Sequence, residues 1–253
     1  MNWAGVSAIY RFEMARARRT LWQSLVAPVI TTSLYFLVFG SAIGSRMSAM
    51  QGVDYGSFIV PGLILLSVLQ QSIFNASFGI YFPKFTGTIY ELLSAPLSPF
   101  EAVLAYVGAA ASKAVILALV TLATAFLFVP VQIDHPLLML TFLIAISTGF
   151  CLLGFAIGIW AKNFEQLQVV PLLVVTPLTF LGGVFYSVTA IGEPWRTLTH
   201  LNPILYLVSG FRWTFFGTAD VPLAASLAVM AAVIALPLGA IVWIFRTGYR
   251  LKT

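Results

Sequence analysis

Long stretches without any charged side chain dominate this sequence and narrow its possible folds more than any other feature. Uncharged runs cover 20–45, 55–83, 135–161, 166–192 and 221–245, and the stretch 102–133 is interrupted only by Lys113. An α-helix rises 1.5 Å per residue, so about 20 residues cross the roughly 30 Å hydrocarbon core of a bilayer. Each of these six stretches is long enough to span a membrane, whereas the apolar run 197–211 is too short.

The shortage of charge also excludes most soluble classes of protein. The chain has 253 residues, of which 60% are hydrophobic and 8% are charged, while a typical soluble domain carries roughly 25% charged residues. Its 13 Lys and Arg and 8 Asp and Glu side chains cannot form the polar shell that a soluble fold needs. An ordinary cytosolic enzyme, a nucleic-acid module and a disordered tail are therefore excluded. The sequence predicts an all-α integral membrane protein that lies in the lipid bilayer, with no nucleic-acid partner.

Six membrane-spanning helices are predicted, at about 22–44, 57–82, 102–129, 137–160, 166–186 and 223–245. An even number of spans places both termini on one side of the membrane. With the N-terminus inside, nine Lys and Arg residues fall on the cytoplasmic side and three on the outer side, the bias typical of cytoplasmic loops. The sequence therefore predicts a multi-pass protein with both termini in the cytoplasm.

Two segments outside the spans are expected to lie at the membrane surface. In residues 1–20, apolar side chains recur at helical spacing along one face, namely Trp3, Val6, Tyr10, Met14, Ala17 and Leu21. This pattern predicts an amphipathic interfacial helix whose arginines face lipid headgroups or a partner; the alternative is a topology signal alone. The outer segment 187–216 is apolar and aromatic, which predicts a re-entrant element before the last span.

The loop 83–101 contains a segment that can form a short helix. Gly87 and Pro96 bracket residues 88–95, and Thr88 stands three residues before Glu91, which is capping-box spacing. Such a helix would present Leu92 and Leu93 to the cytosol, where a soluble partner could dock. The alternative is an ordinary capped loop.

Polar residues inside the predicted spans need a partner or water. In the second span, Ser67, Gln71 and Asn75 repeat every four residues with Gln70 beside them, so this face should point into the bundle or a water-filled path. Hydrogen bonding between helices is the alternative to a transport role. Lys113 must reach the surface, pair with another group or line a cavity.

Prolines in the fifth span predict a bent helix. Pro171 and Pro177 both remove backbone hydrogen bonds, and a bend suits a gate, although static bundles also contain kinked helices.

Sequence motifs for catalysis are missing. The chain contains no phosphate-binding loop, no nucleophile elbow and no His-Glu-x-x-His. With one Cys, Cys151, and two His, at His135 and His200, no metal-ligand cluster is available. We expect no catalytic site, metal or cofactor on this chain, so its energy source is another polypeptide or an ion gradient.

Three short blocks carry a family resemblance: Tyr90–Pro99, Leu181–Tyr186 and Leu201–Arg212. In their order and placement on a six-span frame they resemble the permease subunits of ABC-2 type exporters, closest to the bacterial drug, lipooligosaccharide and polysaccharide branch. The resemblance covers nearly the whole chain. It implies a single ABC-2 transmembrane domain over 1–253, with the type V exporter-like fold.

The resemblance also implies roles and partners. Two ATP-binding subunits, which would hold ATP and Mg, and a second permease copy forming a homodimer would complete an exporter in a bacterial inner membrane. Residues expected to contact the ATPase are Thr88, Tyr90, Glu91, Leu92, Leu93, Arg16, Arg18 and Arg19. Residues expected along the translocation path or a helix interface are Ser67, Gln70, Gln71, Asn75, Lys113, Pro171, Thr176 and Pro177. The expected outer gate comprises Phe185, Tyr186, Asn202, Pro203, Tyr206 and Arg212.

Other functional classes stay open beside the exporter. An ion-coupled carrier usually places acidic groups at mid-membrane, whereas all eight acids here lie in loops or near predicted span ends. A membrane-embedded enzyme would need convergent catalytic side chains, and a scaffold would need none. Apolar walls with a few amides suit drugs, lipids and lipid-linked sugars alike, so we expect an amphiphilic or lipid-linked substrate.

Overall fold

The structure is a computed structural model that describes residues 1–43 and 49–250, apart from the side chains of residues 21, 23 and 41–43. Within these residues the chain is helical and forms no β-strand, with one isolated bridge between Met50 and Val53. The helices are α1 (Trp3–Arg19), α2 (Leu21–Tyr35), η1 (Phe36–Ile43), α3 (Tyr55–Phe58), α4 (Val60–Thr86), α5 (Ile89–Ser94), α6 (Pro99–Ala125), α7 (Pro136–Trp160), α8 (Phe164–Val170), η3 (Pro171–Val175), α9 (Thr176–Phe180), η4 (Val188–Ala190), α10 (Trp195–His200), α11 (Pro203–Phe216) and α12 (Leu223–Thr247).

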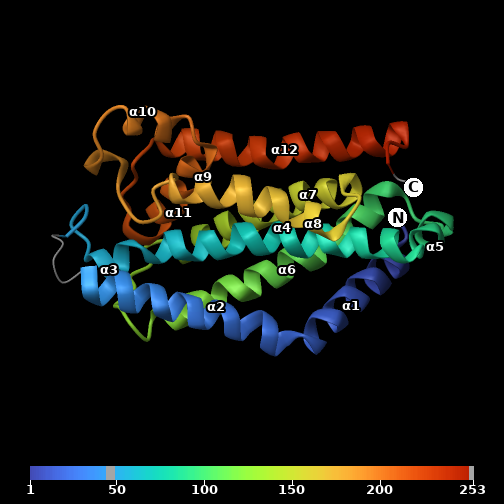
Figure 1. The fold of residues 1–253 in the computed structure, drawn as a ribbon, viewed down its shortest axis with the longest axis horizontal. Coiled ribbons are helices and arrows are strands. Elements are labelled where there is room, and N and C mark those ends of the chain that lie inside the picture. The colour runs from blue at the N-terminus through green and yellow to red at the C-terminus, as the bar shows by residue number, and fades with distance from the viewer. Residues whose placement is uncertain (44–48, 251–253) are drawn as a thin grey trace.

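The long helices run side by side along the length of the molecule (Figure 1). The N-terminus, α5 and the last turns of α12 lie at one end of this bundle, which we call the α5 end; α3 and α10 lie at the other, the α10 end. Helix α4 is central and packs mainly against α7 and α6, while α12 covers α7 and α1 lies along α6. The start of α1 and the last turns of α12 therefore lie at the same end of the bundle.

Four helices are long and apolar enough to cross a membrane: Tyr55–Thr86, α6, α7 and α12. They correspond to the predicted spans 57–82, 102–129, 137–160 and 223–245. The segment predicted at 22–44 forms α2 and the π-helix η1, and passes the same test only together with α1, from which it is bent by 60°. Its residue 44 and the side chains of residues 23 and 41–43 lie outside the described residues, as does the side chain of Leu21 in the apolar stripe predicted for the N-terminal helix.

The fifth predicted span, 166–186, is shorter than expected. Its helical part, Phe164–Phe180, is an apolar helix of fewer than 18 residues, and π-helical residues Pro171–Val175 interrupt it between the two prolines. The count of six spans and the re-entrant path of 187–216 stay predictions. The described residues give four span-length helices, or five if the bent pair is one span.

Prolines and glycines mark where several helices begin and end. Pro99 opens α6 and Pro203 opens α11, where the missing N–H is no loss. Gly87 and Gly217 follow α4 and α11 with φ values of 80° and 66°, the left-handed conformation that closes a helix.

Thr88 is the N-cap residue of α5, as predicted, but the capping box expected with Glu91 does not form. The Thr88 side chain makes no cap hydrogen bond, and its Oγ1 lies 3.0 Å from Oγ1 of Thr86. The capping box forms one helix later, where Ser98 and Glu101 satisfy each other's backbone N–H groups at the start of α6. Helix α5 is Ile89–Ser94, and with its cap residues Thr88 and Ala95 it covers the predicted segment 88–95.

Glycines on α7 allow α4 to approach closely. A Cβ atom at Gly154 would lie 2.4 Å from the carbonyl oxygen of Ile73, and one at Gly158 would lie 2.4 Å from that of Ser77. These two glycines are four residues apart, so they share one face of α7. Between lipid-embedded helices, small residues of this spacing permit backbone contact that larger residues prevent.

We predict that Gly158→Ala lowers stability by about 1–3 kcal/mol, because the added methyl group overpacks the α4–α7 contact. Thermal unfolding in detergent, followed by loss of the monodisperse species, measures this. Gly108→Ala is the matched control, since a Cβ at Gly108 meets nothing within 4 Å. Equal midpoints for the two variants would show that this contact does not hold α4 against α7.

Candidate translocation path and partner-docking surface

One face of α4 is left partly uncovered, and it is polar. Most of the helix is buried, but Ser67, Gln70, Gln71 and Asn75 are only half-buried. These four residues, which we call the amide stripe, lie at helical spacing on one face, as the sequence predicted. Asn75 donates a hydrogen bond from Nδ2 to the Gln71 carbonyl oxygen at 2.9 Å.

The amide stripe meets the interrupted helix α8–α9. Gln70 donates a hydrogen bond from Nε2 to Thr176 Oγ1 at 3.0 Å, and Thr176 donates in turn to the Pro171 carbonyl oxygen at 2.8 Å. A pocket of about 280 Å³ opens between the two elements and is lined by Gln70, Gln71, Phe74, Gln168, Pro171, Leu172 and Thr176. The structure therefore brings Gln70 and Gln71 of span two together with Pro171 and Thr176 of span five. The predicted residues Ser67, Asn75 and Pro177 do not line the pocket, and Gln168, which does, was not predicted.

Lys113 lies elsewhere, at the interface between α6 and α1. Its Nζ is 3.0 Å from Glu13 Oε2, and Arg16 binds the same oxygen at 2.7 Å. Of the roles left open for Lys113, pairing is the one observed. One helical turn earlier on α1, Tyr10 donates a hydrogen bond to Ser112 at 2.9 Å, so two polar contacts fix α1 against α6.

Glu13 is a residue that the sequence analysis missed. It lies outside the predicted spans, as expected for an acid, yet its side chain is only 3% exposed. Two features of the sequence could have indicated that Glu13 is buried and paired. It lies on the face of α1 that carries Tyr10 and Ala17, and it precedes Arg16 by three residues, the spacing of an ion pair within a helix. A carboxylate on an otherwise apolar helix face needs a cation opposite it, and Lys113 supplies that cation.

A second buried ion pair lies at the α10 end. Arg212 on α11 and Asp220 before α12 are 2.9 Å apart, and both side chains are 0% exposed. Arg212 also donates to the Gly183 carbonyl oxygen at 2.6 Å, and its guanidinium lies 3.9 Å from the centroid of the Phe58 ring. Asp220 accepts further hydrogen bonds from Ser187 and Gln51. Arg212 was predicted to belong to the outer gate. In the structure it links α11 to Phe58, Gly183 and Asp220, which lie in three other parts of the chain.

The other predicted outer-gate residues occupy two places at the α10 end. Phe185 stacks on Phe39, with centroids 4.8 Å apart, and so contacts η1. Asn202 is the N-cap of α11, which begins at Pro203, and its Oδ1 accepts a hydrogen bond from the backbone N–H of Ile204. Its Nδ2 donates a hydrogen bond to the carbonyl oxygen of Leu178 at 2.5 Å. The hydroxyl groups of Tyr186 and Tyr206 donate to backbone carbonyls of Leu181 and His200 within the same segment.

The predicted docking residues fall into two groups: residues 88–93 belong to α5 and its N-cap at one end of the bundle (Figure 1), whereas the three arginines belong to the last turn of α1. Tyr90, Glu91 and Leu93 are exposed, whereas Leu92 is half-buried and packs with buried Ile89 against the bundle. On α1, Arg18 and Arg19 are exposed, but Arg16 is held by Glu13. The structure therefore gives Arg16 an internal role that the sequence analysis did not anticipate.

The described residues contain no group of three His, Cys, Asp or Glu side chains that could hold a metal ion. His135 stacks on Trp213 with centroids 4.8 Å apart, and Cys151 is buried in the core. The described residues do contain a set of span-length helices with paired internal charges, and a polar pocket between one of these helices, α4, and the shorter helix α8–α9. This combination defines a helical, multi-pass membrane protein.

Comparison with known proteins then identifies the family. Residues 5–216 match the model of the ABC-2 type transporter family, and the chain belongs to that family. It is 40% identical over 234 residues to the inner membrane transport permease YadH of Escherichia coli (strain K12), covering 92% of this chain and 91% of the relative. It is also similar to nodulation protein J of Azorhizobium caulinodans, at 25% identity over 84% of this chain and 83% of the relative. Nodulation protein J of Neorhizobium galegae is 22% identical over 94% of this chain and 90% of its own length.

We predict that Glu13→Gln lowers stability by about 1–3 kcal/mol, since it leaves Lys113 and Arg16 without their shared carboxylate in a largely buried site. Thermal unfolding measures the loss, and limited proteolysis shows whether α1 separates from α6. Arg18→Gln, on the exposed side of α1, is the control. The double variant Glu13→Gln with Lys113→Gln should lose less than the sum of the single losses; strict additivity would contradict the pairing.

Proposed function

We propose that this chain is the membrane-spanning permease subunit of an ATP-driven exporter. ATP and Mg would bind a separate ATP-binding subunit, and an amphiphilic or lipid-linked substrate would leave the cytoplasm or the inner leaflet. Membership of the ABC-2 family supports an ATP-binding partner, and the name of the Escherichia coli relative supports an inner-membrane location. Both termini would then lie in the cytoplasm together with α5.

The observation that carries the proposal is the amide stripe on α4. Amide side chains are unfavourable against lipid, so a membrane helix turns them toward protein or water. In the single chain these residues are half-buried and border a pocket of about 280 Å³. A second copy of the permease facing this stripe would enclose it and create a polar path between the two chains.

Docking of the ATPase is assigned to α5 in this proposal. In the chain, α5 connects the two long helices α4 and α6, so a displacement of α5 would move both of them. Its inner side is anchored through Ile89, and its outer side offers Tyr90, Glu91 and Leu93. Two copies of the ATPase would engage two copies of this surface.

The first test is purification of the tagged chain from its native membrane in mild detergent, followed by identification of the proteins that accompany it. A stoichiometric soluble protein with a phosphate-binding loop is expected. A chain that purifies alone from gently handled membranes would contradict the exporter and return the ion-coupled carrier, the membrane enzyme and the scaffold to consideration.

We predict that Glu91→Ala weakens coupling to the ATPase about tenfold, by removing a charged contact worth 1–2 kcal/mol at a docking surface. Transport-dependent ATP hydrolysis in reconstituted vesicles measures this, while expression and thermal stability should stay unchanged because Glu91 is exposed. Glu193→Ala, an exposed acid at the α10 end, is the control. Equal activity of both variants would exclude a docking role for Glu91.

We also predict that cysteines on the amide stripe cross-link between two copies. In a Cys151→Ser background, which removes the one native thiol, Asn75→Cys and Gln71→Cys should give covalent dimers with a short bifunctional maleimide. Leu236→Cys on α12, which is 73% exposed, should not. Dimers formed at Leu236 and not on the stripe would move the interface to α12 and contradict a path along α4.

A further inference from the structure

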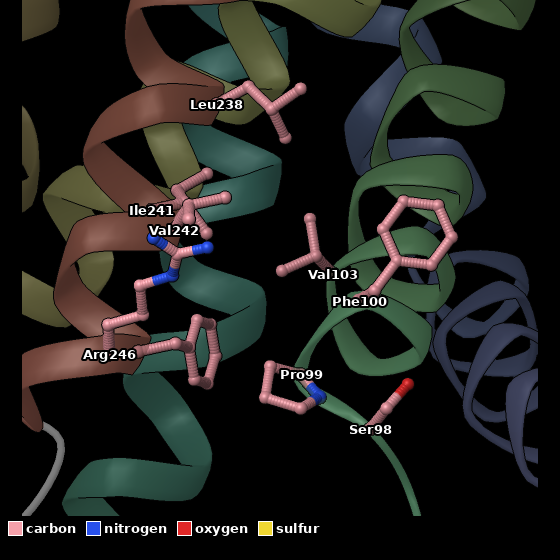
Figure 2. Close-up of a pocket in the computed structure, with 9 residues that line it drawn as sticks. Ser98, Pro99, Phe100, Val103, Leu238, Ile241, Val242 and Arg246 are labelled. Atoms are coloured by element: carbon pink, nitrogen blue, oxygen red, sulfur yellow. The ribbon is translucent and has the colours of Figure 1, made fainter.

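A groove lies between α6 and α12, near the start of α6 and the end of α12 (Figure 2). Its volume is about 310 Å³. Its walls include Val103 on α6 and Leu238, Ile241 and Val242 on α12. Arg246 also lines it, and its side chain extends back along α12 toward Val242 (Figure 2). Apart from Ser98 at the start of α6 and Arg246, the lining side chains are apolar.

The surroundings of the groove determine what can fill it. Both α6 and α12 are span-length apolar helices, and only 17% of the most apolar window of α12 is buried within the chain. This flank therefore faces hydrocarbon, and its apolar walls do not hold water. From Leu238 to Arg246 the groove follows eight residues of helix, about 12 Å at 1.5 Å per residue. That length is close to one leaflet of a hydrocarbon core roughly 30 Å thick, so an acyl chain from one leaflet fits along it.

Arg246 gives the groove a positive charge that no acidic side chain among the described residues neutralises. Arg246 takes part in none of the ion pairs among the described residues, and no acidic side chain lines the groove. The nearest acid along α6, Glu101, is already engaged by the backbone N–H groups of Ser98 and Asn2. A guanidinium presents a planar set of N–H donors that matches phosphate oxygens.

We propose that this groove is a binding site for an anionic phospholipid of the leaflet at the α5 end. One acyl chain lies along Val103, Leu238 and Ile241, and the phosphate accepts hydrogen bonds from Arg246. The Arg246 guanidinium favours an anionic headgroup over a zwitterionic one. In phosphatidylcholine the choline cation already neutralises the phosphate and competes with the arginine for it. The site is independent of the transport path, since it lies between different helices.

The test uses the full-length protein reconstituted in phosphatidylcholine vesicles with and without phosphatidylglycerol. Photoactivatable phosphatidylglycerol should label peptides from residues 99–103 and 238–246. Native mass spectrometry then counts retained lipid. Arg246→Gln should lower retention of phosphatidylglycerol about fivefold, the factor expected from losing one arginine attraction of about 1 kcal/mol, and should leave phosphatidylcholine retention unchanged.

Two further variants keep the result interpretable. Val242→Trp, on the open side of the groove, should fill it and reduce labelling without touching the charge. Arg196→Gln makes the same charge change at the α10 end and should have no effect. Unchanged retention in Arg246→Gln, labelling outside the two peptides, displacement of the lipid by inorganic phosphate alone, or a polypeptide cross-linked in the groove would each overturn the proposal.

Discussion

Direct contact between the backbones of α4 and α7 is the interaction on which the rest of the bundle depends. Lipid tails are as apolar as leucine, so burial of apolar surface does not by itself drive two spans together; close packing does. Gly154 and Gly158 place α7 against the carbonyl oxygens of Ile73 and Ser77. On another side of α7, a Cβ atom at Gly149 would lie 2.9 Å from a side-chain methyl group of Val233 on α12 and 3.2 Å from its carbonyl oxygen. Glycines on two sides of α7 thus set its spacing from α4 and from α12.

The polar face of α4 is a consequence of that packing. With α7 and α6 covering the rest of the helix, only the amide stripe stays partly open, and its neighbour is the interrupted helix α8–α9. Pro177 has no N–H to bond within the helix, and the backbone N–H of Thr176 bonds to Pro171 five residues earlier. The wider π-helical turn that results lets the Thr176 side chain bond both Pro171 and Gln70. The two prolines, which the sequence analysis interpreted as a bend, thus enclose a wider helical turn, and this turn supplies Thr176 as the hydrogen-bond partner of Gln70.

Sequence reasoning succeeded where one physical variable decides the outcome. Apolar length alone located the four span-length helices, and helical spacing alone placed the amide stripe on one face of α4. It failed where two candidates compete for the same role. Thr88 with Glu91 and Ser98 with Glu101 have identical capping spacing, but only the second pair precedes a long helix whose first turn needs those hydrogen bonds. Partners distant in the sequence, such as Glu13 for Lys113, could not be assigned because no local pattern encodes which helices pack together.

The two buried ion pairs differ in how many segments each joins, and that difference sets which part of the bundle rearranges at the lower cost. At the α10 end, Arg212 and Asp220 join α11, the turn after α9, α3 and the loops at Gln51 and Ser187, with both charges fully buried. Breaking these interactions leaves several buried polar groups without hydrogen-bond partners at once, which is costly in a medium of low dielectric constant. Near the middle of α6, Glu13 joins α1 to Lys113. Arg16, which lies 5.2 Å from the centroid of the Phe78 ring on α4, is 28% exposed and can exchange its partner for water. Movement of α1 against α6 is therefore the less costly rearrangement, whereas the α10 end moves as one connected unit.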